Sequence, residues 1–277
     1  MIQDSQTNTL YFADTLPLKY PAFYERLEKT LKECHVEYQL LPNTKDVWAV
    51  DYMPIQVSDN VFVQFSYNPD YLKSARWHKT ITDVDDVCNA IKIKPVKSNI
   101  ILDGGNISKS LQTVIMCDKV FRENPAYKEK EIIIALQTVF EIDKIFFVPQ
   151  DMNDFTGHAD GMVRFINEDT VLINDYSGES PEFQSAFRMS LHNAGLDYIE
   201  IPYCPDLKTK DSAKGLYLNY LEIGKVILLP VFGIEEDEDA VGHFEDLFAG
   251  YTIRTVESNE IAVHGGVLNC ISWNIKS

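Results

Sequence analysis

The chain has 277 residues, of which 45% are hydrophobic and 24% are charged, an ordinary globular composition with enough length to bury a sizeable core. Its 25 Lys and Arg residues against 42 Asp and Glu residues give a formal charge of −17, which argues against nucleic acid as a partner. The same charge suits a cationic substrate, although a solvated acidic surface is the commoner explanation of such an excess.

The sequence carries no sign of a secretory or membrane segment. Residues 1–5 lack the basic start and the apolar stretch of a signal peptide, and no apolar run approaches the length of a membrane span. The five cysteines form no CxxC or CxxH pair, which argues against a disulfide framework or a structural zinc site. We therefore expect a cytoplasmic protein without a metal and without a membrane partner.

Amphipathic stretches and short apolar runs alternate along the chain. Apolar residues recur at helical intervals in most of five stretches, which predicts helices at 20–34, 82–93, 126–140, 181–194 and 237–248. The runs that follow them are rich in β-branched and aromatic residues and predict strands at 38–41, 99–102, 144–148, 198–201 and 252–256. Turn signals precede further strands at 61–65, 170–173 and 226–231, so each unit is predicted as strand, turn, strand, helix and strand.

The two ends of the chain are predicted to share one unit. After residue 270 there is room for one more strand, at 271–275, so the last unit must borrow a strand at 10–13 and the first helix from the N-terminus. This closes a ring of five units. No linker rich in Pro, Gly or Ser divides the chain, which predicts a single domain over residues 1–277.

Polar residues recur with the same period. Asp51, Asp103, His158 and Cys270 are separated by 52, 55 and 112 residues, so the last interval is about twice the others. The skipped position falls near Asn219. Such spacing indicates a repeated unit that presents one residue per repeat to a common centre.

The sequence around these positions favours a site over a structural role. His158 and Asp160 lie two residues apart between glycines, so on a strand both would project from one face. A lone histidine, by contrast, is more often a hydrogen-bonded structural residue. Cys270 follows Gly265 and Gly266, which permit the backbone to approach a ligand closely, although a cysteine among apolar residues is more often inert core.

The two remaining acids have plausible structural interpretations of their own. Asp103 begins an Asp-Gly-Gly-Asn sequence, which is a strong turn signal in any protein. Asp51 lies among apolar neighbours, including Trp48 and Pro54, and a half-buried acid there needs a partner. A cationic ligand is one way to supply it.

Taken in order, these motifs resemble those of the agmatine deiminase and bacterial-type peptidylarginine deiminase family, in the guanidine-modifying pentein superfamily. The resemblance spans most of the chain and implies an α/β fold, a five-bladed propeller of ββαβ units with pseudo-fivefold symmetry. It implies a deiminase that hydrolyses a guanidinium C–N bond and releases ammonia, with a small cationic guanidinium compound as substrate and no cofactor.

The resemblance also implies roles for individual residues. Cys270 matches the nucleophile that forms a covalent thiouronium intermediate, His158 the general acid and base, and Asp103 an acid that supports the histidine. Asp51 and Asp160 match the carboxylates that clamp the guanidinium group. The remaining substrate-binding positions that it indicates are Trp48, Asn219, Gly265 and Gly266.

Three positions depart from the family pattern, and they bear on the choice of substrate. Val50 stands where the family usually has arginine, Asn269 where it has histidine, and Thr156 where an acid commonly precedes the Gly-His pair. The chain is also shorter than typical agmatine deiminases.

Several functions stay open at this level. The resemblance favours conversion of agmatine to N-carbamoylputrescine, as in putrescine biosynthesis. Alternatives are conversion of protein-bound or free arginine to citrulline, transfer of the amidino group to an amine, and a non-catalytic pentein that only binds its ligand. A Cys/His/Asp peptidase is the weakest rival, because it leaves two acids unexplained. A homo-oligomer is compatible with all of them.

Overall fold

The computed structural model describes residues 1–205 and 212–277, whose strands form five small sheets of three strands each. In every sheet the central strand is antiparallel to the first and parallel to the third. The sheets are β15 (Ser272–Ile275), β1 (Thr9–Ala13) and β2 (Tyr38–Leu41); β3 (Ile55–Ser58), β4 (Val61–Ser66) and β5 (Val96–Ile101); β6 (Ser108–Lys109), β7 (Thr113–Cys117) and β8 (Lys144–Val148); β9 (Val163–Phe165), β10 (Thr170–Asn174) and β11 (Asp197–Ile201); and β12 (Leu221–Ile223), β13 (Val226–Val231) and β14 (Thr252–Glu257).

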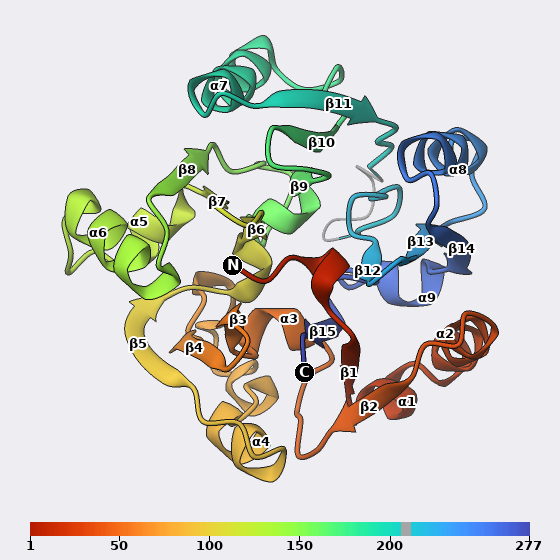
Figure 1. Cartoon of the computed structure of the whole chain (residues 1–277), viewed down its shortest axis with the longest axis horizontal. Helices are drawn as coiled ribbons and strands as arrows, with labels where there is room; N and C mark the ends of the chain where they lie inside the picture. Colours follow the sequence, from red (N-terminus) through yellow and green to blue (C-terminus); the bar gives the residue numbers. More distant parts are fainter. Residues whose placement is uncertain (206–211) are drawn as a thin grey trace.

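A helix connects the central strand of each sheet to its parallel third strand. These helices lie on the outside of the molecule, and the sheets lie around its centre (Figure 1). They are α2 (Pro21–Glu33), α4 (Val84–Ala90), α6 (Glu129–Phe140), α7 (Pro181–Asn193) and α8 (Glu236–Leu247). All five helices were predicted from the sequence, with ends that differ by a few residues.

The outer helices bury one face against the sheets, including the sheet of the neighbouring unit: α2 packs against β14 and α7 against β8. In α2 the buried residues are Phe23, Leu27 and Leu31, four residues apart and therefore on one side of the helix. In α7 the buried pair Phe187 and Leu191 belongs to a hydrophobic cluster that includes residues of the adjacent sheets. The core is thus divided into several clusters, of which the largest joins helices and strands of adjacent units.

The two ends of the chain share one sheet, as the sequence predicted. β1 pairs with β15 in antiparallel register, with Thr9 opposite Ile275 and Phe12 opposite Ser272. β1 also pairs with β2 in parallel. The hairpin of β6 and β7 was not predicted: β6 has only two residues, and the apolar run of β7 at 113–117 was not assigned to a strand.

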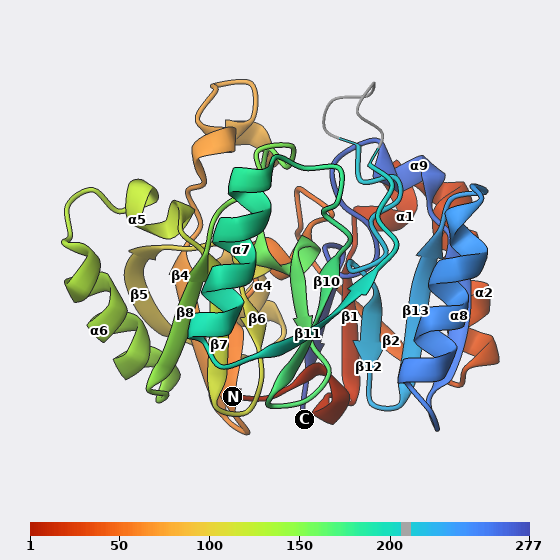
Figure 2. The ribbon, with the colours of Figure 1, turned by 90° about the horizontal axis from the view of Figure 1, so that it is seen from above.

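The molecule has two distinct faces, each with a cavity. Both termini lie on one face, and the segment between β4 and α4 rises from the opposite one (Figure 2). We call the front cavity the one lined by this segment, which contains η2 (Asp70–Leu72) and η3 (His78–Thr80); its volume is about 540 Å³. The rear cavity, of about 580 Å³, is lined by residues 2–5 near the N-terminus. Within the described residues, no helix is both long enough and apolar enough to cross a membrane.

Candidate active site

The polar residues singled out in the sequence occupy equivalent places in the five units. Each lies within about five residues before the first strand of its sheet: Asp51 in α3 (Ala49–Tyr52) before β3, Asp103 at the start of η4 (Gly104–Asn106) before β6, His158 and Asp160 at η5 (Ala159–Gly161) before β9, Asn219 before β12, and Cys270 before β15. Because these segments point toward the centre, residues far apart in sequence meet there. The sequence pattern suggested that His158 and Asp160 lie on one strand. In the structure they do not, because they lie in a loop and a 3-10 turn.

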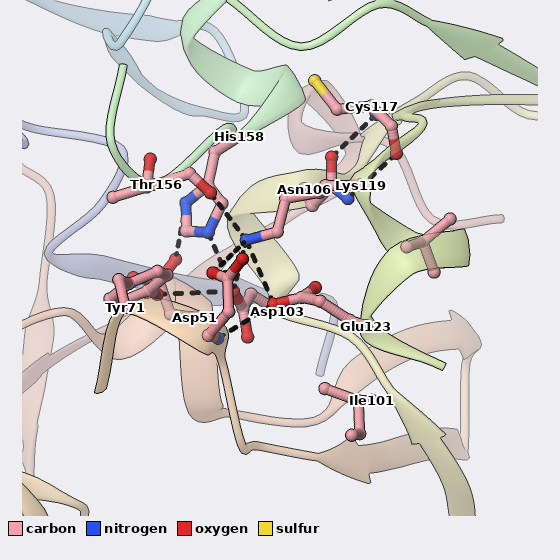
Figure 3. A network of polar contacts seen from close by, with 12 residues as sticks. Asp51, Tyr71, Ile101, Asp103, Asn106, Cys117, Lys119, Glu123, Thr156 and His158 are labelled. Atoms are coloured by element: carbon pink, nitrogen blue, oxygen red, sulfur yellow. Dashed lines mark hydrogen bonds and ion pairs between the residues drawn. The ribbon is translucent and has the colours of Figure 1, made fainter. Parts of the chain in front are cut away.

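His158 lies between two carboxylates. Its Nε2 is 3.0 Å from Oδ2 of Asp103, and its Nδ1 is 3.5 Å from Oδ1 of Asp51 (Figure 3). Burial alone would lower the pKa of His158, but the charge of Asp51 and the hydrogen bond with Asp103 raise it to about 9. The imidazole is therefore protonated at neutral pH.

Asp103 is almost completely buried and is held by several donors. Besides His158, Lys119 Nζ lies 3.4 Å from its Oδ2, and the hydroxyl of Tyr71 donates to the same oxygen at 3.3 Å. Burial would raise the pKa of Asp103, but the hydrogen bond with His158 and the positive charges of His158 and Lys119 lower it. Asp103 is thus an ionised partner for the imidazolium.

Asp51 is a buried acid with an oxygen left unpartnered in the described part of the chain, as are Asp103 and Glu123. Asp51 is 8% exposed, and its Oδ1 has no hydrogen-bond partner among the described residues. Burial raises the pKa of Asp51 to about 8, and the charges of Asp103 and Asp160 act in the same direction. A cation entering the front cavity, which Asp51 lines, would supply the missing partner.

Cys270 is held by an asparagine from the neighbouring unit. Asn219 donates from Nδ2 to Sγ of Cys270 at 3.1 Å and accepts the backbone N–H of Cys270 at 3.2 Å. The Oδ2 of Asp160 lies 3.8 Å from Sγ. Burial and the charges of Asp160 and Asp51 raise the pKa of Cys270 well above its ordinary value, so these surroundings favour the thiol over the thiolate.

Asp160 lies behind the thiol. Its Oδ2 accepts hydrogen bonds from Asn219 at 3.2 Å and from Asn269 at 2.6 Å, and its side chain lines the rear cavity. Burial raises the pKa of Asp160. Asn269, one of the departures from the family pattern, therefore fixes an acid of the site, and Val50, another departure, lines the same rear cavity.

Trp48, Gly265 and Gly266 surround the thiol. Trp48 and Gly265 line the front cavity together with Asp51, His158 and Cys270. A Cβ atom on Gly266 would lie 2.7 Å from Cζ3 of Trp48 and 2.9 Å from Cβ of Cys270, so a larger residue would collide with both. The indole and the nucleophile candidate are close because this position is glycine.

Lys119 is a site-proximal residue that the sequence did not reveal. It follows the apolar run 113–117 and looks there like an ordinary surface lysine, yet it is 1% exposed. Tyr71 and Glu123 were missed for the same reason, because no motif marks them. In the described part of the chain, no group of His, Cys, Asp and Glu side chains is arranged to hold a metal ion.

A thiol, an imidazolium and a buried carboxylate at one cavity, with two further buried carboxylates in contact with the imidazolium and the thiol, are the chemical groups of a cysteine-dependent hydrolase. The family model of the Porphyromonas-type peptidyl-arginine deiminases matches residues 8–275, so the chain belongs to this family.

Curated relatives and solved structures agree with this family. A Mycoplasma mycoides protein with the curated name "Putative agmatine deiminase" is 24% identical over 229 residues, which cover 71% of this chain and 63% of the relative. The chain thus spans less than two thirds of the length of that relative.

Two solved structures of the Campylobacter jejuni agmatine deiminase have the same fold. One superposes with a TM-score of 0.80 at 17% identity, over 100% of this chain and 95% of the other. The second, a cysteine-to-serine variant with substrate bound, gives a TM-score of 0.81 at 18% identity, over 100% and 96%. This chain therefore has the mixed α/β pentein fold.

Proposed function

We propose that this protein is a deiminase that hydrolyses the guanidinium C–N bond of agmatine or an arginine derivative and releases ammonia. The observation that carries the proposal is the front cavity, where the thiol of Cys270, the imidazolium of His158 and the unsatisfied carboxylate of Asp51 lie together. Agmatine is the favoured substrate, because relatives and fold neighbours carry the name agmatine deiminase.

The guanidinium group would bind between Asp51, which lines the front cavity, and Asp160, whose Oδ2 lies 3.8 Å from Sγ of Cys270 on the rear side of the thiol. Guanidinium is planar and permanently charged, so carboxylates on two sides can hold it by charge-assisted hydrogen bonds and fix its central carbon near Sγ of Cys270. Its charge also offsets the acids that raise the pKa of Cys270. Substrate binding therefore favours loss of the thiol proton to solvent and formation of the thiolate, which the surrounding acids by themselves disfavour.

The reaction then proceeds in two halves. The thiolate of Cys270 attacks the guanidinium carbon, and the C–N bond breaks as His158 gives a proton to the departing ammonia. The neutral imidazole next takes a proton from water, which attacks the thiouronium carbon and displaces the sulfur. As the C–S bond breaks, the added hydroxyl gives up its proton, so with agmatine one water is consumed and the products are ammonium and N-carbamoylputrescine. No step requires a metal or an organic cofactor.

Broader features belong to the same proposal. The five sheets would be the blades of a closed propeller with pseudo-fivefold symmetry, supported by their common strand order and by the pairing of β1 with β15. Residues 1–277 would form one catalytic domain, because the sheet shared by the two chain ends leaves no obvious boundary. The free thiols of Cys34, Cys88, Cys117 and Cys270 suit a cytoplasmic location. A homo-oligomer remains compatible with these features.

An assay of ammonia release tests the proposal. Agmatine, free arginine and a peptide with an internal arginine should be compared, with formation of the urea product measured in parallel. We expect turnover of at least one compound, with agmatine preferred, and loss of turnover in Cys270→Ala. Cys34→Ser, a change at a half-buried thiol at the C-terminal end of α2, should leave turnover unchanged.

Mass spectrometry of quenched reactions tests the covalent step. The parent protein should gain the mass of the substrate less ammonia, and Cys270→Ala should not. Ammonia release by Cys270→Ala at the parent rate would eliminate the covalent mechanism. Turnover only with an added amine acceptor would replace hydrolysis by amidinotransfer.

A further inference from the structure

Lys119 is a buried cation that the proposed reaction does not use. It begins α5 (Lys119–Glu123), directly after β7 and its single connecting residue, and only 1% of its surface is exposed. Its Nζ donates a hydrogen bond to the backbone oxygen of Thr156 at 2.6 Å and lies 3.4 Å from Oδ2 of Asp103. A buried lysine is costly unless its charge has partners, so this arrangement needs an explanation.

Three carboxylates and an aromatic ring surround the ammonium group. Asp103 and Glu123 are each 3.4 Å from Nζ, Asp70 is 4.0 Å away, and the ring centre of Tyr71 is 5.1 Å away. Burial would lower the pKa of Lys119, but these acids raise it. The side chain therefore stays protonated, and it is shared between a site acid and acids outside the site.

The contacts of Lys119 connect both parts of the His158–Asp103 pair. Asp103 accepts the hydrogen bond of His158, and Thr156 lies two residues before His158 in the loop 154–158. One ammonium group thus holds the carboxylate and the loop that carries the imidazole. Figure 3 shows Nζ of Lys119 between the carboxylate of Asp103 and the backbone oxygen of Thr156, beside the ring of His158.

We infer that Lys119 is a positioning residue, which fixes Asp103 and the His158 loop in the arrangement that aligns the imidazole. The expected effect of Lys119 on catalysis rests on the proposed function. Tyr71 assists, because its hydroxyl donates to the same Asp103 oxygen and its ring packs edge-on against the ring of His158. In the alternative, Lys119 only neutralises the charge of Glu123. An experiment must distinguish this role from the positioning of His158.

The charges around His158 determine in which direction its pKa should change when Lys119 is replaced. Asp51 and Asp103 raise the pKa of His158, whereas burial and the charge of Lys119 lower it. Removing the positive charge of Lys119 should therefore raise the pKa of His158 further. It should not weaken substrate binding much, because Lys119 is not among the described residues that line the front cavity.

The first variant is Lys119→Met, which keeps the length of the side chain and removes its charge. Histidine resonances should be titrated by NMR in the substrate-free protein, with His158→Gln identifying the signal among the six histidines. We expect a higher pKa for His158 and a kcat that falls about 100-fold, as small misplacements of reacting groups do, with KM changed much less. An unchanged pKa and kcat in a folded variant would overturn the inference.

The double variant Lys119→Met/Glu123→Gln removes one charge of each sign, so it keeps the net charge of the cluster and protects folding. If Lys119 positions His158, the raised pKa and the lowered kcat persist in the double variant. If Lys119 only neutralises Glu123, both return to the parent values, and the inference is wrong. Arg122→Met is the matched control, because Arg122 is an exposed cation on the same helix and should change neither quantity.

The two proposals can fail separately. The NMR titration needs no substrate, so its result stands even if the parent protein releases no ammonia from any guanidinium compound. That outcome would overturn the proposed function and leave the coupling between Lys119 and His158 measurable.

Discussion

At the residue scale, the site concentrates negative charge where a cation is expected. Asp51, Asp103 and Asp160 are all buried near His158, and their repulsion is relieved only in part by the imidazolium and Lys119. Burial and the charges of the neighbouring acids disfavour ionisation of Asp51, and a bound guanidinium group would favour it. The same negative field disfavours the thiolate of Cys270 until the substrate arrives.

The Asp51→Asn variant should separate the role of Asp51 in substrate binding from its influence on the Cys270 thiol, because the variant should lower turnover but make the thiol more reactive. Loss of a charge-assisted hydrogen bond to guanidinium costs on the order of 1.5–3 kcal/mol, so kcat/KM should fall by roughly 10- to 150-fold or more. In the free protein, removal of the Asp51 charge should lower the pKa of Cys270 and speed its alkylation by iodoacetamide at pH 9.

The control for this experiment is Asp59→Asn, an exposed acid in the turn between β3 and β4 of the same unit. This variant should change neither kcat/KM nor the rate at which Cys270 is alkylated. An unchanged kcat/KM in Asp51→Asn, on whichever compound is turned over, would mean that Asp51 has a structural role and that the clamp lies elsewhere.

At the scale of the elements, short irregular segments hold the site, and the regular strands only position them. α3, η4 and η5 pack beside one another near the centre. Gly105 in η4 is what permits their approach. A Cβ atom there would lie 2.4 Å from Nδ1 of His158 and 2.6 Å from Oδ1 of Asp51, so no side chain fits between these segments.

Gly105→Ala should therefore damage the site more than the fold. The added methyl group must push His158 away from Asp51, and we expect kcat/KM to fall about 100-fold. Overpacking of this kind typically costs about 1–3 kcal/mol of stability, and circular dichroism should still report a folded protein.

Gly242→Ala is the contrasting glycine variant. Gly242 lies inside α8, and a Cβ atom added to it would meet no other atom within 4 Å, so alanine should leave activity unchanged and stabilise the helix by about 0.5–1 kcal/mol. Full activity in Gly105→Ala would show that the spacing of His158 and Asp51 does not matter for turnover.

The outer elements and the meeting point of the site could be predicted from the sequence, because both follow a repeat. Helical periodicity identified α2 and α7, and the regular spacing of Asp51, Asp103 and His158 predicted that they meet. What the sequence could not show is burial by tertiary contacts. Lys119 has the local context of a surface lysine, and it is buried only because Asp103, from earlier in the same unit, and Thr156, from the next unit, approach it.

At the scale of the whole molecule, the site separates two cavities that open on opposite faces. Cys270, His158 and Asp51 line the front cavity, whereas Asp160 and Asn269 line the rear one. Residues of the N-terminal segment and of β15 also line the rear cavity, so the sheet shared by the chain ends forms part of its wall. The rear cavity contains its own buried acid, Glu222 on β12.

Glu222 should make the stability of the whole protein depend on pH. Burial raises its pKa to about 7, and the charge of Asp4 acts in the same direction, whereas Arg164 and Lys109 oppose it. A carboxyl group with a raised pKa binds its proton more tightly in the folded state than in the unfolded state. Its contribution is therefore fully present below about pH 4.5 and is lost as the pH rises through about 7.

The Glu222→Gln variant should remove this dependence. Between the two pKa values, each pH unit costs the parent about 1.4 kcal/mol from this one group, equivalent to a few degrees in Tm for a chain of this size. The Tm of the variant minus that of the parent should thus become more positive from pH 5 to pH 8. The trend should persist in 0.5 M NaCl, because salt screens the exposed charges behind the net charge of −17 much more than a buried group. A difference in Tm that stays constant over this range would show that Glu222 ionises in the folded protein as easily as in the unfolded chain.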